Sequence, residues 1–173
     1  MDLLDFESSE LYFDQAIDAE AEDCIEAAAR EYGSSASEPL LMRAYFLEPQ
    51  HPVVLVALYR FFYYQHRYPE ALIVAERVLL LFAGRLGLPA CWQNIEPARV
   101  GSDGQSLTEL RFYLLALKGA AYLELRLGRY EMAIDRLRTI EDLDDEDRLG
   151  AAALLRIAED EVQRQSGVYR LRF

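Results

Sequence analysis

A turn followed by a helix occurs twice in this chain, and this repeat is the feature that most constrains its fold. Residues 67–72 read RYPEAL and residues 129–134 read RYEMAI. Tyr68 and Tyr130 each stand three residues before a small alanine, Ala71 or Ala133, directly after a short turn. An alanine at this position allows two helices to cross closely, while the tyrosine wedges the turn. A repeated unit of this kind predicts helical hairpins that stack on their neighbours.

Apolar residues recur with helical spacing over nearly the whole chain, and strand-like alternation is scarce. The length of 173 residues suits one domain with a single core. Ser37 is the predicted N-cap of the second helix, and Pro39 lies in its first turn. Seven helices are predicted, from about Ser9 to Glu31, Ser37 to Leu47, after the 48–52 break to His66, Pro69 to between Gly84 and Gly87, Leu107 to Leu127, Tyr130 to Leu143 and Asp145 to Gln165.

The helical pattern breaks between Leu88 and Ser106, where prolines and glycines are frequent. This stretch is predicted to be a loop of about 20 residues, a length that is uncommon in compact domains and often functional. Trp92 lies within it and is the only tryptophan of the sequence. We expect Trp92 to pin the loop to the helices; an interface anchor is the alternative.

The repeats resemble the tetratricopeptide repeat (TPR) family, whose unit is a helix–turn–helix of about 34 residues. The resemblance implies an all-α, right-handed superhelical solenoid of about three hairpins with a C-terminal capping helix at 145–165. The repeats fall at about 22–50, 51–85 and 111–145 of a single domain, 1–173, with the inserted loop at 88–106. A generic array of helical hairpins is the alternative. The matching core positions are Ile25, Ala28, Ser37 and Leu41 in the first unit, Leu55, Leu58, Tyr59, Phe62, Tyr68, Ala71, Ala75 and Val78 in the second, and Leu117, Ala120, Ala121, Gly128, Tyr130, Ala133, Leu137 and Ile140 in the third.

The same resemblance implies a concave groove that is lined by the first helix of each hairpin and binds proteins. Arginine and tyrosine are enriched where binding energy concentrates at protein interfaces. As the alternative, the rings pack against the inserted loop and the arginines pair with the acidic first helix. The partner-binding residues implied by position are Arg60, Tyr63 and Tyr64 in the second repeat and Lys118, Tyr122 and Arg126 in the third.

Charge narrows the partners that this chain can bind. It holds 30 acidic and 18 basic residues, for a formal charge of −12. Nucleic acid and anionic membranes are therefore unfavourable partners. Both ends are strongly acidic, which serves either solubility or steering toward a basic patch on a partner. The acidic N-terminus is unlike a signal peptide, so we expect a soluble cytoplasmic protein.

Catalytic and metal-binding patterns are weak. Two histidines and two distant cysteines give no zinc-ribbon spacing, and no phosphate-binding glycine motif is present. We expect His51 and His66 to serve turns or caps, and Cys24 to be buried on its helix. The sequence therefore predicts a protein that is not an enzyme and has no catalytic, cofactor or metal site.

Three stretches, residues 52–63, 85–92 and 111–118, are similar to short TPR proteins that accompany nitrogenase genes in nitrogen-fixing bacteria. This resemblance implies a chaperone-like adaptor, a nitrogenase-associated factor that binds the molybdenum–iron protein. The alternative is a type III secretion chaperone that holds a segment of a translocator, or another TPR scaffold. Apolar pockets that accept a short peptide favour the secretion chaperone, whereas a nitrogenase factor requires a folded partner surface.

Overall fold

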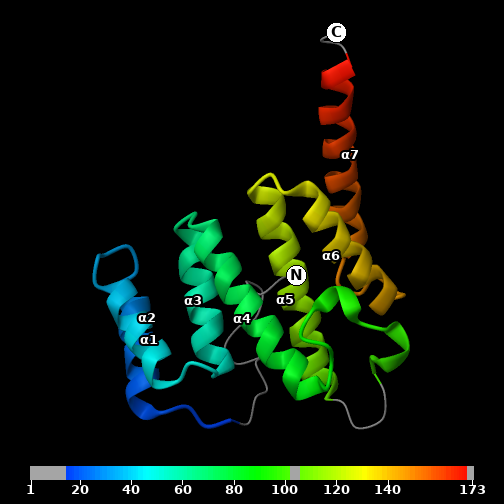
Figure 1. Ribbon diagram of the computed structural model, residues 1–173. Coiled ribbons are helices and arrows are strands. Elements are labelled where there is room, and N and C mark those ends of the chain that lie inside the picture. Colours follow the sequence, from blue (N-terminus) through cyan, green and yellow to red (C-terminus); the bar gives the residue numbers. More distant parts are fainter. Residues whose placement is uncertain (1–14, 102–105, 171–173) are drawn as a thin grey trace. The chain divides into compact units, whose positions relative to one another are not determined.

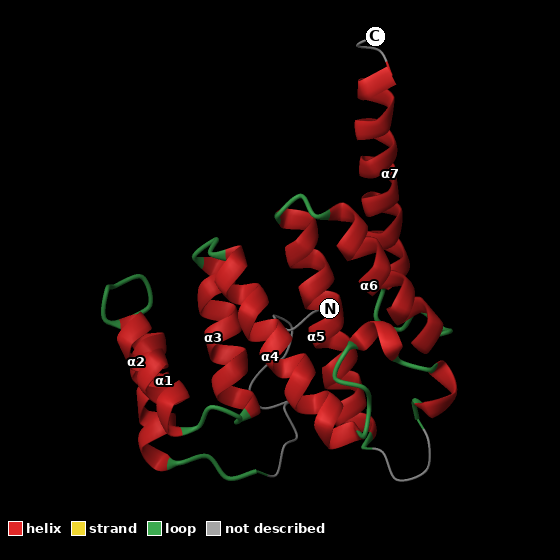
Figure 2. Cartoon of the chain, viewed as in Figure 1, coloured by secondary structure: helices red, strands yellow, loops and turns green. Residues whose placement is uncertain are grey.

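The computed structural model describes residues 15–101 and 106–170 of the chain. These residues form seven α-helices and two short 3-10 turns, and none of them lies in a strand (Figures 1 and 2). The predicted all-α class is therefore confirmed. The described residues divide into two compact units, 15–74 and 75–170, and the division falls inside helix α4 (Tyr68–Leu86). The single domain and the right-handed solenoid stay predictions.

The first unit contains α1 (Ala19–Arg30), α2 (Ser37–Leu47), α3 (Pro52–Tyr64) and the start of α4. α1 packs along α2, and α3 contacts both of them (Figure 1). Small buried residues of α1, among them Ala21, Cys24 and Ala28, allow this close packing, and the predicted burial of Cys24 is confirmed. An arginine in the turn before α4 then ties two helices together, because Arg67 pairs with Glu38 of α2 at 2.7 Å and with Glu70 of α4 at 2.8 Å.

Helix α1 begins later than its sequence pattern predicts. Residues 9–14 of the predicted helix lie outside the described part of the chain, and residues 15–18 are not helical. The carboxylate of Asp18 accepts hydrogen bonds from the backbone N–H groups of Glu20 and Ala21, at 2.9 and 3.2 Å. This side chain satisfies the first N–H groups of the helix and so fixes its start at Ala19.

The predicted cap of α2 is also wrong. Ala36 occupies the N-cap position, and Ser37 is the first helical residue. The hydroxyl of Ser37 is fully buried and donates to the carbonyl oxygen of Glu31 at 2.5 Å. It therefore secures the end of α1 instead of capping its own helix.

Helix α3 ends at Tyr64, two residues before the predicted end. His66 adopts a left-handed backbone conformation with φ of 57°, and an α-helix cannot continue through this conformation.

The predicted capping role of His51 is confirmed: its Nδ1 atom accepts from the N–H of Val53 at 3.3 Å and caps α3. Its Nε2 atom lies 3.1 Å from the carbonyl oxygen of Gln15, which is the geometry of a donated hydrogen bond.

The second unit contains the end of α4 with α5 (Leu107–Arg126), α6 (Tyr130–Leu143) and α7 (Ala151–Arg170). α6 packs against both α5 and α7, as Figure 1 shows. Gly128 has a φ of +74°, so the tight turn between α5 and α6 uses a conformation that favours glycine. Ala71 and Ala133, the repeated alanines, are both fully buried.

Helix α7 starts at Ala151, and the predicted start at Asp145 is wrong. Asp147 lies in a turn with φ of 47°, and its carboxylate accepts from the N–H groups of Ala151 and Ala152 at 2.6 and 3.2 Å. Gly150 follows the same turn with φ of +66°. Asp147 therefore caps the helix from outside, and the acidic residues at 145–147 precede the helix and do not lie on its face.

The segment predicted to be an irregular loop contains two 3-10 turns, η1 (Trp92–Asn94) and η2 (Pro97–Arg99). Trp92 is buried, and η1 contacts α6. The guanidinium carbon of Arg136 on α6 lies 4.9 Å from the centroid of the Trp92 ring. The expectation that Trp92 pins this segment to the helices is confirmed.

Arg136 belongs to a buried polar cluster that the sequence pattern did not predict. Its side chain is 4% exposed, and it pairs with Glu76 and, at 3.6 Å, with Glu124, which is 5% exposed. Within the described residues, its Nε and Nη1 atoms make no hydrogen bond. Burial raises the pKa of the nearby Tyr113 hydroxyl, and the positive charge of Arg136 only partly opposes this effect. Tyr113 therefore stays a neutral phenol at physiological pH.

Enlarging Ala133 tests the close packing of the third predicted repeat. We expect Ala133→Trp to lower the free energy of unfolding by about 1–3 kcal/mol, because the buried site has no room for the ring. For a chain of this size each kcal/mol lowers Tm by about 2–4 °C in a thermal melt followed by circular dichroism. Met132→Trp is the matched control, because Met132 is exposed. An equal Tm for Ala133→Trp and the wild type would contradict the packing.

Removing one partner of the buried ion pair tests the polar cluster. We expect Glu124→Ala to destabilise the protein by about 3 kcal/mol, because it deprives a buried cation of a carboxylate. Adding Arg136→Met should restore at least half of this loss, since methionine leaves no charge to compensate. Urea unfolding of both variants measures the difference. A double variant as unstable as Glu124→Ala would show that the charge of Arg136 is not the cause.

Candidate functional site

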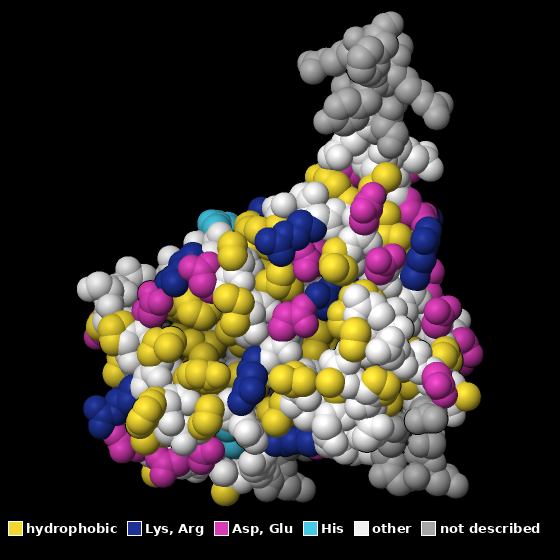
Figure 3. Space-filling model, in the orientation of Figure 1, with side chains coloured by type: hydrophobic (Ala, Val, Ile, Leu, Met, Phe, Trp, Pro, Cys, Tyr) yellow, Lys and Arg dark blue, Asp and Glu magenta, His cyan; other side chains and the backbone are white. Residues whose placement is uncertain are grey.

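An open groove of about 580 Å³ lies between α1 and α3 in the first unit. In Figure 3, hydrophobic side chains gather around a hollow on the face that carries these two helices. Most of the lining side chains are aliphatic or aromatic. They are Ile25, Ala28, Ala29, Tyr32, Leu41, Val53, Val56, Ala57, Arg60, Phe61 and Tyr64.

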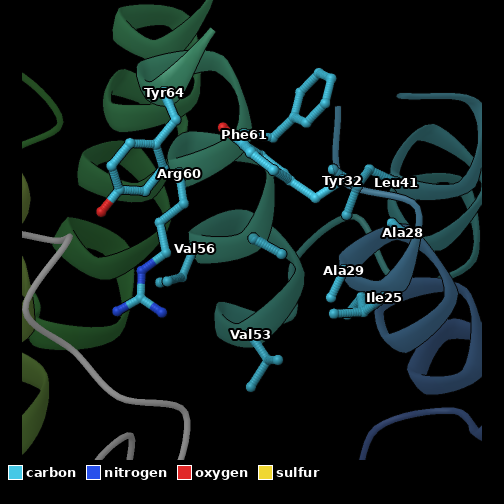
Figure 4. Close-up of a pocket in the computed structure, with 11 residues that line it drawn as sticks. Ile25, Ala28, Ala29, Tyr32, Leu41, Val53, Val56, Arg60, Phe61 and Tyr64 are labelled. Atoms are coloured by element: carbon cyan, nitrogen blue, oxygen red, sulfur yellow. The ribbon is translucent and has the colours of Figure 1, made fainter. Parts of the chain in front are cut away.

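Helical spacing explains why these residues share one surface. Ile25, Ala28, Ala29 and Tyr32 follow one another at three- and four-residue steps, so they form one stripe along α1 and its end. A second stripe runs along α3 from Val53 to Tyr64 with the same spacing. Figure 4 shows the two stripes on opposite sides of the groove. The groove is thus built by two helix faces and not by a loop.

Two tyrosines remain accessible at the groove. Tyr32 is 55% exposed and Tyr64 is 53% exposed, although both side chains line it. In Figure 4 the Tyr32 side chain extends from the end of α1 toward α3. Tyrosine offers an apolar ring and a polar hydroxyl, a combination that is enriched at protein interfaces.

Arg60 supplies the charge inside the groove. Of the described residues that line the groove, Arg60 alone is charged, and it is half-buried. The opposite border is acidic, because Glu22 and Glu26 lie exposed on α1, three residues before Ile25 and Ala29. Arg30 pairs with Glu26 at 3.3 Å and offsets one of these two charges. The α3 wall and the α1 border therefore carry charges of opposite sign.

The structure separates the three binding residues predicted in the second repeat. Arg60 and Tyr64 line the groove, whereas Tyr63 does not. The Tyr63 ring belongs to a cluster of aromatic side chains: its centroid lies 6.2 Å from that of Tyr59, 6.0 Å from that of Tyr68 and 5.5 Å from that of Tyr64. Tyr63 thus supports Tyr64 and the turn after α3.

The three residues predicted in the third repeat lie on α5, in the second unit. Lys118 is only 6% exposed, and its Nζ atom donates to the carbonyl oxygen of Leu149 at 2.5 Å. Its ammonium therefore holds the segment before α7 and is not presented at a surface. Arg126 is exposed and donates to the hydroxyl of Tyr122 at 3.1 Å. For Tyr122 and Arg126, partner binding stays a prediction.

Several groove residues were missed because the repeat pattern assigned them to the core. Ile25, Ala28 and Leu41 match core positions of the first repeat, yet they also line the groove. A signal was present in α3, whose sequence PVVLVALYRFFYY has Arg60 as its one charged residue and otherwise apolar or aromatic residues around the whole helix. A helix of this kind needs cover around its whole circumference. The described part of the first unit leaves one side of it open.

Other chemically reactive side chains are used structurally or stand alone. His66 Nδ1 lies 2.9 Å from the hydroxyl of Tyr68, and the exposed Cys91 donates to Oε1 of Gln93 at 2.6 Å. In the described ranges, 15–101 and 106–170, no group of three or more His, Cys, Asp or Glu side chains is placed to hold a metal ion. None of the helices described is both long and apolar enough to span a membrane.

Filling the groove tests whether it is an accessible apolar site. Ala29 is exposed and lines the groove, so Ala29→Trp should occupy it without disturbing the core. We expect this variant to bind a polarity-sensitive fluorescent dye about tenfold more weakly than the wild type, because apolar contact area is removed from the site. Ala98→Trp, on an exposed residue of η2, is the control. Unchanged dye binding in Ala29→Trp would place the apolar site elsewhere.

Comparison with known proteins identifies a relative with a similar sequence. The chain is 46% identical over 156 residues to an uncharacterized 19.8 kDa protein in the nifW 5′ region of Azotobacter chroococcum mcd 1. The match covers 90% of this chain and 87% of that protein. No protein-family model matches the chain, and neither does any solved structure. Membership in the TPR family thus stays a prediction. The identity and coverage show that the chain belongs to the same family as the Azotobacter chroococcum protein.

Proposed function

We propose that this protein is a nitrogen-fixation factor that binds another protein through the groove between α1 and α3. The observation that carries the binding role is the apolar, open lining of that groove. The position of its relative in the nifW 5′ region supports the link to nitrogen fixation. The partner that we propose is the molybdenum–iron protein of nitrogenase, and the groove contacts a part of the folded surface of that protein.

The chemistry of the lining supports binding. Aliphatic side chains give contact area, Tyr32 and Tyr64 give rings with polar ends, and Arg60 gives forked hydrogen-bond donors. An apolar surface that stays open to water is costly in a protein that works alone. A partner that covers this surface recovers that free energy, which gives the groove its proposed function as an adaptor or chaperone-like site.

The strong negative charge supports a partner with a basic region. A formal charge of −12 speeds encounter with a positively charged surface and opposes encounter with anionic ones. Such steering acts on the rate of association and depends on salt. In this proposal, the acidic chain brings the partner close, and the groove then holds it.

The apolar lining also favours a second candidate, a type III secretion chaperone that holds an apolar segment of a translocator. Such a chaperone would be stabilised by the isolated segment alone. A nitrogenase factor would require the folded partner. Thermal melts with an isolated translocator segment and with purified molybdenum–iron protein therefore separate the two candidates.

Affinity capture from the native host tests the proposed partner. The tagged full-length protein is recovered from cells grown with and without fixed nitrogen, and the bound proteins are identified by mass spectrometry. We expect nitrogenase subunits only in the nitrogen-fixing culture. Recovery of a secretion translocator, or equal recovery of nitrogenase subunits with an untagged control, would reject the proposal.

Charge reversal at two arginines tests the surface used. We expect Arg60→Glu combined with Arg126→Glu to weaken partner binding at least about tenfold, because Arg60 lines the groove and arginine is enriched among the residues that carry most of the binding energy at interfaces. Helix content in circular dichroism should stay at the wild-type level. Arg148→Glu with Arg164→Glu is the matched control, because both arginines are more than 70% exposed and each pairs with one glutamate. Wild-type affinity in the first double variant would exclude the groove as the binding site.

A further inference from the structure

We infer that a cationic side chain of the partner, an arginine or a lysine, binds against Tyr32 and Tyr64 at one end of the groove, while apolar side chains of the partner fill the other end. This inference rests on the proposed function, in that the groove between α1 and α3 binds another protein. It adds the chemistry of the contact and the direction in which the partner surface lies along the groove.

The lining of the groove changes in character from one end to the other. Ile25 and Val53 belong to the first halves of α1 and α3, and both are aliphatic. Tyr32 follows the end of α1, and Phe61 and Tyr64 lie in the last turn of α3. Figure 4 shows the two aliphatic residues toward one end of the groove and the three rings toward the other. We call these parts the aliphatic end and the aromatic end.

The tyrosines of the aromatic end present accessible rings. Tyr32 and Tyr64 each have more than half of their surface exposed. The ring of Tyr64 is held edge to face against Tyr63, with the centroids 5.5 Å apart and the planes at 84°. The face of an aromatic ring attracts the ammonium of a lysine or the guanidinium of an arginine within about 6 Å of the ring centroid. Accessible rings of this kind therefore suit a cationic side chain.

The electrostatics at the end of α1 favour the same sign of charge. Both α1 and α3 finish at the aromatic end, so the partial negative charges of two helix C-termini lie there. Arg30 in the last turn of α1 is already paired with Glu26 at 3.3 Å. Glu31 is exposed and directly precedes Tyr32. Its carboxylate accepts a hydrogen bond from the neutral hydroxyl of Ser34 at 3.3 Å, which does not cancel its charge.

The arginines that flank Tyr64 in the sequence are engaged elsewhere. Arg67 pairs with two glutamates, at 2.7 and 2.8 Å. Arg60 has an interaction of its own, and in Figure 4 its side chain extends toward Val56 and away from Tyr32. The cation that fits the aromatic end is therefore one that the partner brings. The formal charge of −12 on the whole chain favours the approach of such a partner.

Two fluorescent probes that differ in a single group test the cation site on the full-length protein. Both carry a dansyl ring on the same short alkyl chain. The chain ends in a guanidinium in dansyl-agmatine and in an uncharged urea in its analogue. From the dansyl emission during titration, we expect dansyl-agmatine to bind about fivefold more tightly than the urea analogue, because only the guanidinium is attracted to the ring faces.

Variants of the two tyrosines separate the effect of the rings from that of the overall charge. Tyr32→Leu combined with Tyr64→Leu leaves the charge unchanged and should bind both probes equally. Tyr32→Phe combined with Tyr64→Phe keeps both rings and should keep the wild-type preference. Tyr45→Leu is the matched control, because Tyr45 is a half-buried tyrosine of α2 outside the groove lining. Circular dichroism checks that each variant keeps its helix content.

The same variants test the contact with a folded partner. With purified molybdenum–iron protein, we expect the leucine double variant to bind at least about tenfold more weakly than the wild type. The phenylalanine double variant should bind within about twofold of the wild type, since its rings still attract a cation. Wild-type affinity of the leucine double variant for this protein would overturn the inference.

Three further results would overturn it. They are equal affinity of the wild type for the two probes, a preference that persists in the leucine double variant, and a wild-type dimer in sedimentation that the leucine double variant dissociates. The last result would assign the groove to a second copy of this chain. The probe assay contains no nitrogenase. Probe discrimination without capture of nitrogenase would therefore reject the proposed partner alone, and capture of nitrogenase without probe discrimination would reject the cation site alone.

Discussion

The first unit is organised by the apolar circumference of α3. One side of this helix is removed from water by the burial of Val54, Leu55, Leu58 and Tyr59. The other side carries Val53, Ala57 and further apolar residues that α1 covers only in part, and the uncovered part is the groove. The stability of the unit and the presence of the open groove thus have the same origin: α3 has more apolar area than its described neighbours remove from water.

The second unit depends on a different interaction. Arg136 is buried between carboxylates and the ring of Trp92, and it connects α6 to the segment between α4 and α5. A buried cation is tolerated only where charges and ring faces compensate it. Because Glu76, Trp92 and Glu124 all contribute, this one side chain fixes several parts of the unit at once. Lys118 acts in the same way on the turn before α7.

These two kinds of packing divide the protein by role. In the second unit, the side chains of Lys118, Glu124 and Arg136 are buried and serve internal packing, so a partner cannot reach them. In the first unit the described lining is apolar around a single guanidinium, with acidic residues along the α1 border. The chain belongs to the same family as a protein of the nifW 5′ region, and the groove is the surface for which we propose a binding role.

The sequence by itself determined the helical class and most helix positions, because apolar periodicity and glycine turns are local signals. It also identified the buried alanines Ala71 and Ala133, the cap at His51 and the anchoring role of Trp92. Helix starts at Ala19 and Ala151 were missed, since the capping carboxylates of Asp18 and Asp147 compete with equally plausible neighbours. Only the tertiary structure decided which apolar and charged residues stay exposed. Lys118 is buried and Ala29 is open because burial depends on what packs against a residue, and helical spacing does not contain that information.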